Sequence, residues 1–440
     1  MEFRRKLWYT NADESERRCT MITRIQILDN VYLNAIRSDK FKTGCFSVNF
    51  LRPLAREEAA QNALIFGVLL AGTEKHPDIR SISMHLDALY GASVGTLVRK
   101  KGEIQAVGLY ADFVEDELAG EPVFRPLTEF VGELLLSPRM ENGTFYREYV
   151  QTERQNLIRS MRAALNSKQA YANEQMRKAM CPDEPYGLPQ NGEEADLEGV
   201  DEQALFRQYR TLLAQSRVEI FYLGRLAPEA AADIFRAMLE KLPREEVTPL
   251  PQPIQKSVQA VRSLEETMPL EQSKLAMGFR AAPARSVEEV ARMLTFAVLY
   301  GGGSSSKLFL NVREAKSLCY YANTVYDKYK GILRVNSGIA EEAFDEAKQE
   351  ILTQLQDCAD GRFTQDELDT AKRMLFTQIR SDLDSPGRLD EFYLGQAVLD
   401  EQYELETLLD AIEKVTRQDV ERAAAAVQLD TVFFLRGVGE

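Results

Sequence analysis

Positive charge is scarce in this 440-residue chain, in which 54 Lys and Arg residues are outnumbered by 68 Asp and Glu, giving a formal net charge of -14. Such a chain offers no basic face for phosphate groups, which argues against nucleic acid as a partner. Long apolar runs are missing as well: no segment reaches the ~18 residues of a membrane span, and residues 1–20 lack the apolar stretch of a signal peptide. We therefore expect a cytoplasmic protein that does not insert into a membrane.

Cysteine is sparse, and the five residues include no CxxC pair: Cys19, Cys45, Cys181, Cys319 and Cys358. An odd number of widely spaced cysteines is typical of reduced thiols in a cytoplasmic protein rather than of a disulfide framework. We expect these side chains to pack as small apolar residues.

Histidine is scarcer still, with two residues in the chain, His76 and His85. Their spacing differs from the i,i+4 spacing that places two imidazoles on one helical face for zinc, so we expect surface or packing roles. No GxSxG elbow marks a nucleophile, although a triad assembled only in space stays an alternative. The run GGGSSSK, residues 301–307, is not a phosphate-binding loop, because it follows a helical pattern and Lys307 does not directly follow a glycine.

Proline is concentrated in one segment, residues 241–257, which contains Pro243, Pro249, Pro251 and Pro253. Proline at this density stops helices and sheet ladders and stiffens the chain. We therefore predict a linker at residues 241–258 between two domains, 22–240 and 259–440. Residues 1–21 are polar and unpatterned, which indicates an N-terminal arm.

The two halves resemble each other. An offset of 230 places the helical run at 56–73 on the run at 286–303, so that Phe66 coincides with Phe296. A second pair of amphipathic helical runs matches at an offset of 218, with Ser167 on Ser385. The order of the matched elements predicts an α+β fold made of two homologous units, each a mostly antiparallel sheet packed against helices.

A resemblance to a known family is carried by residues 301–323, GGGSSSKLFLNVREAKSLCYYAN. A glycine-rich turn followed by "LF..VRE" and a tyrosine-containing strand is similar to the second-domain signature of the pitrilysin/insulinase-type zinc metallopeptidases. The resemblance extends over nearly all of residues 22–440. It implies two homologous domains per chain and a peptide chamber enclosed by two chains or by a fused double chain.

The family's zinc motif is absent at the matching positions. In the family, H-x-x-E-H on the first long helix supplies two ligands and a general base, and a later glutamate is the third ligand. The resemblance places Ala63, Phe66 and Gly67 at the His, Glu and His positions, and Ser160 at the third-ligand position, with Glu153 retained nearby. We therefore expect no metal and no cofactor in this chain, with zinc only in a partner subunit.

The family's second-domain arginine and tyrosine are present as Arg313 and Tyr320. In the family these residues hydrogen-bond the substrate backbone and support the carbonyl oxygen as charge develops on it. The resemblance therefore implies a substrate-binding role for the pair here. The alternative interpretation is an Arg–Glu surface pair and a core tyrosine.

Retention of the arginine and tyrosine without the metal ligands leads to one hypothesis. The chain is a noncatalytic subunit of a heterodimeric peptidase, inactive alone, that supplies Arg313 and Tyr320 to a peptide held by a zinc-bearing paralogous partner. One alternative is a structural or peptide-binding scaffold with no role in proteolysis, since respiratory-complex core subunits resemble this family without being peptidases. The other is an independent hydrolase that uses unrelated residues. The isolated chain could also pair with itself as a homodimer.

Overall fold

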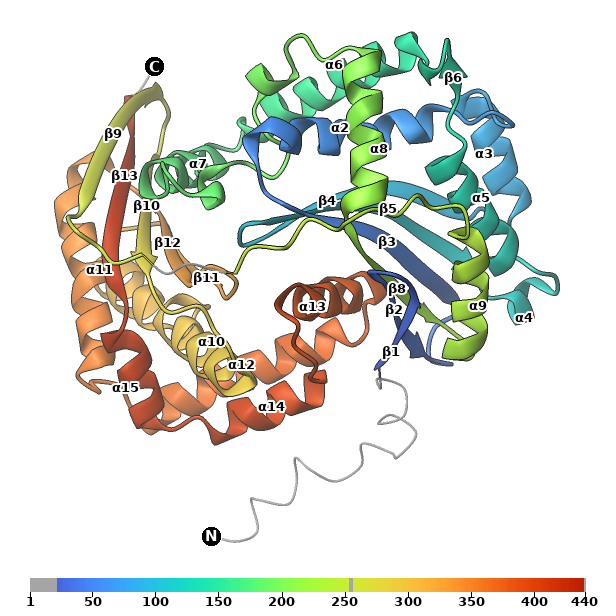
Figure 1. The fold of residues 1–440 in the computed structure, drawn as a ribbon. Coiled ribbons are helices and arrows are strands. Elements are labelled where there is room, and N and C mark those ends of the chain that lie inside the picture. The colour runs from blue at the N-terminus through green and yellow to red at the C-terminus, as the bar shows by residue number, and fades with distance from the viewer. Residues whose placement is uncertain (1–21, 253–255, 439–440) are drawn as a thin grey trace, which may run out of the picture.

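The computed structural model describes residues 22–252 and 256–438, which build two β-sheets with helices packed against them (Figure 1). The first sheet has the strand order β1-β2-β8-β3-β5-β4, with only β2 and β8 parallel. Its strands are β1 (Ile22–Leu28), β2 (Val31–Arg37), β3 (Thr43–Pro53), β4 (Ser93–Lys101), β5 (Ile104–Val114) and β8 (Arg217–Gly224). The other elements of this half are α2 (Arg56–Ala71), α3 (Ile79–Ala88), α4 (Asp116–Ala119), α5 (Phe124–Leu136), β6 (Met140–Glu141), β7 (Thr144–Phe145), α6 (Arg147–Ala164), α7 (Lys168–Met180), η1 (Pro185–Gly187), η2 (Glu194–Leu197), α8 (Glu202–Gln215) and α9 (Pro228–Met238).

The second sheet has the order β11-β12-β10-β13-β9, with only β13 and β9 parallel. Its strands are β9 (Arg262–Pro269), β10 (Ser273–Arg280), β11 (Tyr321–Asp327), β12 (Ile332–Ile339) and β13 (Gln428–Val438). Its helices are α10 (Val287–Gly301), the π-helical η3 (Leu308–Ala315), η4 (Glu341–Ala343), α11 (Phe344–Ala359), α12 (Gln365–Asp382), α13 (Pro386–Leu399), α14 (Leu405–Lys414) and α15 (Arg417–Ala425).

The predicted α+β fold of two homologous units is confirmed. From the parallel pair outward, β2-β8-β3-β5-β4 corresponds strand by strand to β9-β13-β10-β12-β11, and β1 is an addition to the first sheet. The offsets also hold, since α10 begins and ends close to 230 residues after α2, and α12 lies 218 residues after α6.

The predicted domain bounds stay a prediction, although no helix or strand occurs in residues 243–252 or 256–261. The predicted N-terminal arm, residues 1–21, and Pro253 lie outside the described residues. Cys19 lies there too, whereas Cys45, Cys181, Cys319 and Cys358 are free and buried, which confirms their expected packing role. Within the described residues, no helix is both long and apolar enough to cross a membrane.

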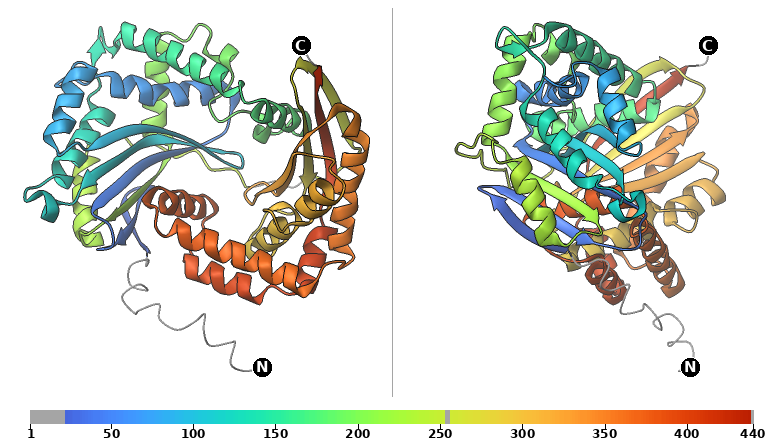
Figure 2. Two further views of the ribbon diagram at one scale, coloured as in Figure 1. Left: turned by 180° about the vertical axis from the view of Figure 1, so that it is seen from behind. Right: turned by 90° about the vertical axis from the view of Figure 1, so that its right-hand side faces the viewer.

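Two helices cross between the halves. Helix α7 from the first half packs on β10 and β13 of the second sheet, burying Met176 and Met180 beside Phe433. Its counterpart α13 packs on β8 and β3 of the first sheet, where Tyr393 stacks on Phe221 at 6.3 Å between ring centroids. Each half therefore covers part of the other half's sheet, as both views from the side and from behind show (Figures 1 and 2).

A buried ionic network also joins the halves. Lys330, in the turn between β11 and β12, places its Nζ 2.6 Å from Glu103 Oε1 and 2.7 Å from Glu184 Oε2. Glu184 also accepts from Arg280 Nη2 at 2.7 Å, and Arg280 Nε donates to Asp430 at 3.0 Å. Although burial opposes its charge, hydrogen bonds from Arg280 and Lys330 hold the pKa of Glu184 at about 2.

Glu115, directly after β5, is a buried carboxyl whose ionisation lowers the free energy of unfolding. Its Oε1 accepts from the backbone N–H of Arg225 at 3.2 Å. Burial raises its pKa to about 7, and the neighbouring Asp116 and Glu117 add to the rise while Arg225 opposes it. Because the unfolded carboxyl titrates near 4.5, the folded state retains the proton longer, and the free energy of unfolding falls as pH rises from about 4.5 to 7.

Replacing Glu115 with glutamine is expected to remove much of that fall, making the variant more stable than wild type at pH 8 by on the order of 1–2 kcal/mol, with a smaller gain at pH 5. Glutamine retains an oxygen acceptor for the Arg225 N–H. Urea unfolding of both proteins at the two pH values measures the effect. The same difference between variant and wild type at pH 5 and pH 8 would count against the ionisation of Glu115 as its cause.

Candidate functional site

The helix that matches the family's zinc motif is part of the first core. Phe66 is completely buried, with its ring centroid 5.8 Å from that of Phe50, and Ala63 is buried as well. Residues on several sides of α2 are buried because the sheet, α6 and α8 all pack against it. A phenyl ring and a methyl group cannot bind zinc or transfer a proton, so this segment has a packing role.

Buried amides surround the same helix. Asn62 Nδ2 donates to Gln105 Oε1 at 3.1 Å, and Gln208 Nε2 donates to Asn62 Oδ1 at 2.8 Å. Gln105 also donates to the carbonyl of Ala59 at 2.9 Å. This hydrogen-bonded group was not predicted from the sequence. Its one signal there is Asn62, an asparagine inside an otherwise apolar helical run.

The remaining zinc-motif positions lie on facing helices. A Cβ atom built at Gly67 would be 3.1 Å from Oε2 of Glu153 on α6, so the retained glutamate occupies the space beside that glycine. Ser160 lies two turns further along α6 and is exposed. No group of three or more His, Cys, Asp or Glu residues able to hold a metal ion occurs within residues 22–252 and 256–438.

The two histidines lie together. The His76 and His85 rings are 4.6 Å apart and both pack on Phe130, while Nδ1 of His76 is 3.0 Å from Oε1 of Glu133. Burial, followed by the neighbouring His76, lowers the pKa of His85. Both are packing histidines, as expected from their spacing.

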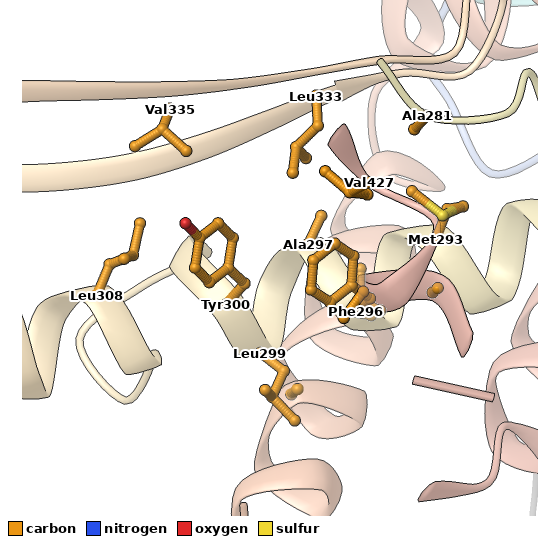
Figure 3. Packing of buried hydrophobic residues seen from close by; sticks show 14 of the residues in the cluster. Ala281, Met293, Phe296, Ala297, Leu299, Tyr300, Leu308, Leu333, Val335 and Val427 are labelled. Carbon is orange, nitrogen blue, oxygen red and sulfur yellow. The ribbon is translucent and has the colours of Figure 1, made fainter. Parts of the chain in front are cut away.

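Arg313 is carried by η3, a π-helix that is anchored in the second core. Leu308 and Val312 are buried in the cluster that contains Tyr300, Phe296 and Val335 (Figure 3). Such π-helical turns are rare and frequently occur at functional sites. The side chain of Arg313 is 42% exposed, its guanidinium lies 4.7 Å from the centroid of the Phe309 ring, and its Nε is 3.7 Å from Glu314. It is therefore supported on one side and open to a ligand on the other.

Tyr320 lies seven residues later, directly before β11. Its backbone N–H donates to the carbonyl of Gly338 at 2.8 Å, while the residue as a whole is 64% exposed. The next residue differs, because the hydroxyl of Tyr321 donates to Gln169 of α7. The alternative of Tyr320 as a core tyrosine is therefore wrong, because the residue is largely exposed, whereas the Arg–Glu surface pair of that alternative is present as Arg313 and Glu314.

A hollow of about 340 Å³ lies beside Arg313. Its wall consists of the glycine turn 301–304, Phe309, Arg313 and residues 321–324 of β11. The glycines permit the close approach of the turn to the strand, because a Cβ atom at Gly301 would be 2.5 Å from Thr324. Arg313 thus lines the hollow, and Tyr320 directly precedes the strand that forms its wall. A guanidinium and a phenol here can donate hydrogen bonds to peptide carbonyl groups.

The sequence of this chain is similar to that of a peptidase family. Residues 199–375 match the family model described as "Peptidase M16 inactive domain". A Bacillus subtilis protein named "Probable inactive metalloprotease YmfF" is 29% identical over 408 residues, covering 91% of this chain and 95% of that protein.

Solved structures extend the similarity to the whole fold. A conserved protein from Enterococcus faecalis V583 has a TM-score of 0.87 at 27% identity, covering 95% of this chain and 99% of that one. The peptidase M16 inactive domain from Pseudomonas fluorescens has a TM-score of 0.78 at 15% identity, covering 95% and 98% respectively. The second similarity concerns the fold alone.

Proposed function

We propose that this chain, a member of the M16 (pitrilysin/insulinase-type) peptidase family, is the noncatalytic subunit of a heterodimeric cytoplasmic zinc metallopeptidase. The proposal starts from the absence of the family's H-x-x-E-H motif in its sequence. It completes the peptide chamber and binds substrate together with a zinc-bearing paralogous partner. Alone it is inactive.

One contrast carries this proposal. The zinc-motif positions hold groups that cannot bind metal: Ala63 and Phe66 are packed into the core, Gly67 is faced by one carboxylate, and Ser160 is an exposed serine. In contrast, Arg313 and Tyr320 are exposed donors, and Arg313 lines a hollow. Core packing alone gives no reason for placing a guanidinium and a phenol at the ends of such a short, well-anchored segment. Substrate contact gives one.

The role of the pair follows from its donors. Zinc in the partner would activate the water that attacks the peptide carbonyl. Arg313 supplies a planar set of N–H donors and Tyr320 one hydroxyl, and both can orient the substrate backbone and stabilise negative charge on the carbonyl oxygen. This chain therefore binds and polarises the peptide while its own residues transfer no proton.

The experiment starts from a tagged chain purified from its native source. We expect a paralogue carrying H-x-x-E-H to copurify, to contain about one zinc per heterodimer and to cleave an unstructured peptide. The tagged chain alone is expected to contain no stoichiometric zinc and to lack peptidase activity that phenanthroline inhibits.

The matched control is a partner whose motif glutamate is replaced by glutamine, because it preserves assembly while removing the general base. If the paralogue copurifies but mixing it with this chain gives no gain in peptide cleavage, the scaffold alternative is favoured. Chelator-sensitive cleavage by the isolated chain would contradict the proposal.

A further inference from the structure

Three basic side chains from separate elements approach each other where the two halves meet. They are Lys100 at the end of β4, Arg177 on α7 and Arg334 on β12, and all three are half-buried. Ile332 packs against α7, and alternation along the strand puts Arg334 on the same face. Burial and repulsion by Arg177 and Arg334 lower the pKa of Lys100, so the three charges act on one another. The elements converge near the centre of the molecule (Figure 1).

The nearby carboxylates are already engaged. Asp327 accepts hydrogen bonds from the Tyr186 hydroxyl at 2.8 Å and from the backbone N–H groups of Tyr329 and Lys330 at 3.0 and 3.2 Å. Glu174 forms an ion pair with Lys178 at 3.1 Å. Three cations therefore meet two carboxylates, that of Asp327, whose partners are neutral donors, and that of Glu174, which is shared with Lys178, so positive charge is in excess.

The arginines also have unused donors. Nε and Nη2 of Arg177 and Nε of Arg334 are buried and have no hydrogen-bond partner among the described residues. Lys100 differs, because its Nζ donates to the carbonyl groups of Tyr186 and Leu188. A buried charged donor without a partner costs more free energy than a buried neutral one, so an arrangement with several is expected to bind an acceptor.

We propose that Lys100, Arg177 and Arg334 form an oxyanion-binding site for a carboxylate or phosphate group. Arginine suits such ligands because its planar donors match two oxygens at once, and Lys100 adds positive charge from its fixed position. The site is separate from the hollow at Arg313, but polar residues connect the two.

The connecting residues make a peptide carboxylate a fitting ligand. Asn323, which lines the hollow, accepts from Asn336 Nδ2 at 3.0 Å, and Asn336 lies two residues from Arg334 on the same face of β12. Gln169 accepts from Tyr321 and donates to Asn336 at 3.4 Å. A peptide bound in the hollow beside these polar residues could place its C-terminal carboxylate at the arginines. Free phosphate would bind at the arginines without contacting the hollow.

The experiment measures thermal unfolding of the full chain with two probes. The first is inorganic phosphate, and the second is the peptide Ac-Ala-Ala-Ala with a free C-terminal carboxylate, compared with its C-terminal amide. At saturation we expect either oxyanion to raise Tm by about 2 °C or more relative to sodium chloride at equal ionic strength. A shift with the peptide acid alone would identify a carboxylate as the ligand, and a shift with phosphate would identify a free oxyanion.

Arg177→Gln and Arg334→Gln are each expected to abolish this shift, and without ligand neither is expected to lower Tm, because each removes one of three repelling charges. Arg210→Gln, at an exposed position on α8, is the matched control and is expected to retain the full shift. No shift of the wild-type Tm with either probe, or an undiminished shift in both variants, would overturn the proposal. These measurements need no partner subunit, so their failure is distinct from failure of the proposed peptidase role.

Discussion

Replacing Tyr320 with phenylalanine is expected to lower the turnover of the reconstituted heterodimer by about 100-fold to 1000-fold, while peptide affinity changes much less. The change removes one hydroxyl and almost no volume. Because Tyr320 is 64% exposed and its backbone N–H still donates to the carbonyl of Gly338, we expect no loss of folding. The missing donor acts most strongly on the oxyanion of the transition state, so kcat falls rather than binding.

Arg313→Ala is expected to have an effect of similar size. Its guanidinium is only partly covered, by Phe309 and Glu314, so its removal leaves no buried partner unsatisfied. Steady-state kcat and KM, the Tm of the isolated chain and its association with the partner separate the effects. Tyr90→Phe, at another exposed tyrosine, is the control and should preserve turnover. Unchanged turnover in both Tyr320→Phe and Arg313→Ala would remove the basis for a substrate-binding role and favour the scaffold.

The repeated fold could be predicted from the sequence because helical periodicity survives in both copies. The offset that places Ser167 on Ser385 also places the starts of α7 and α13 on each other. The exchange of these two helices could not be predicted. Periodicity shows that Met176 and Met180 share an apolar face, but it does not tell which sheet will cover that face.

The candidate site could be predicted from the sequence only in part, for a similar reason. The motif identified Arg313 and Tyr320, but two adjacent tyrosines do not reveal which is exposed, and only the strand geometry separates Tyr320 from Tyr321. The π-helical turn has no sequence signature of its own. The unpaired donors of Arg177 and Arg334 also depend on contacts between elements far apart in the chain.

Lys330→Met is expected to lower the free energy of unfolding by about 3–5 kcal/mol, because it removes the cation between two buried carboxylates. Lys330 is 2% exposed, and its Nζ lies 2.6 Å from Glu103 and 2.7 Å from Glu184. Arg280 still pairs with Glu184 in the variant, but Glu103 is left facing an apolar side chain. Because these residues join the two halves, their loss also weakens the contact between the halves. Urea unfolding at pH 7 measures the change.

The double variant Lys330→Met/Glu103→Gln tests the electrostatic cause. Removing the uncompensated carboxylate should recover part of the lost stability, so the two changes should be less damaging together than the sum of each alone. Lys348→Met is the matched control, because Lys348 pairs with Asp345 at 3.3 Å on the surface of α11 and is expected to contribute less than about 1 kcal/mol. If Lys330→Met costs no more than Lys348→Met, the network around Lys330 does not hold the halves together. The packing of α7 and α13 and the ion pairs of Asp390 and Glu391 on α13 with Arg99 and Lys101 must then do so.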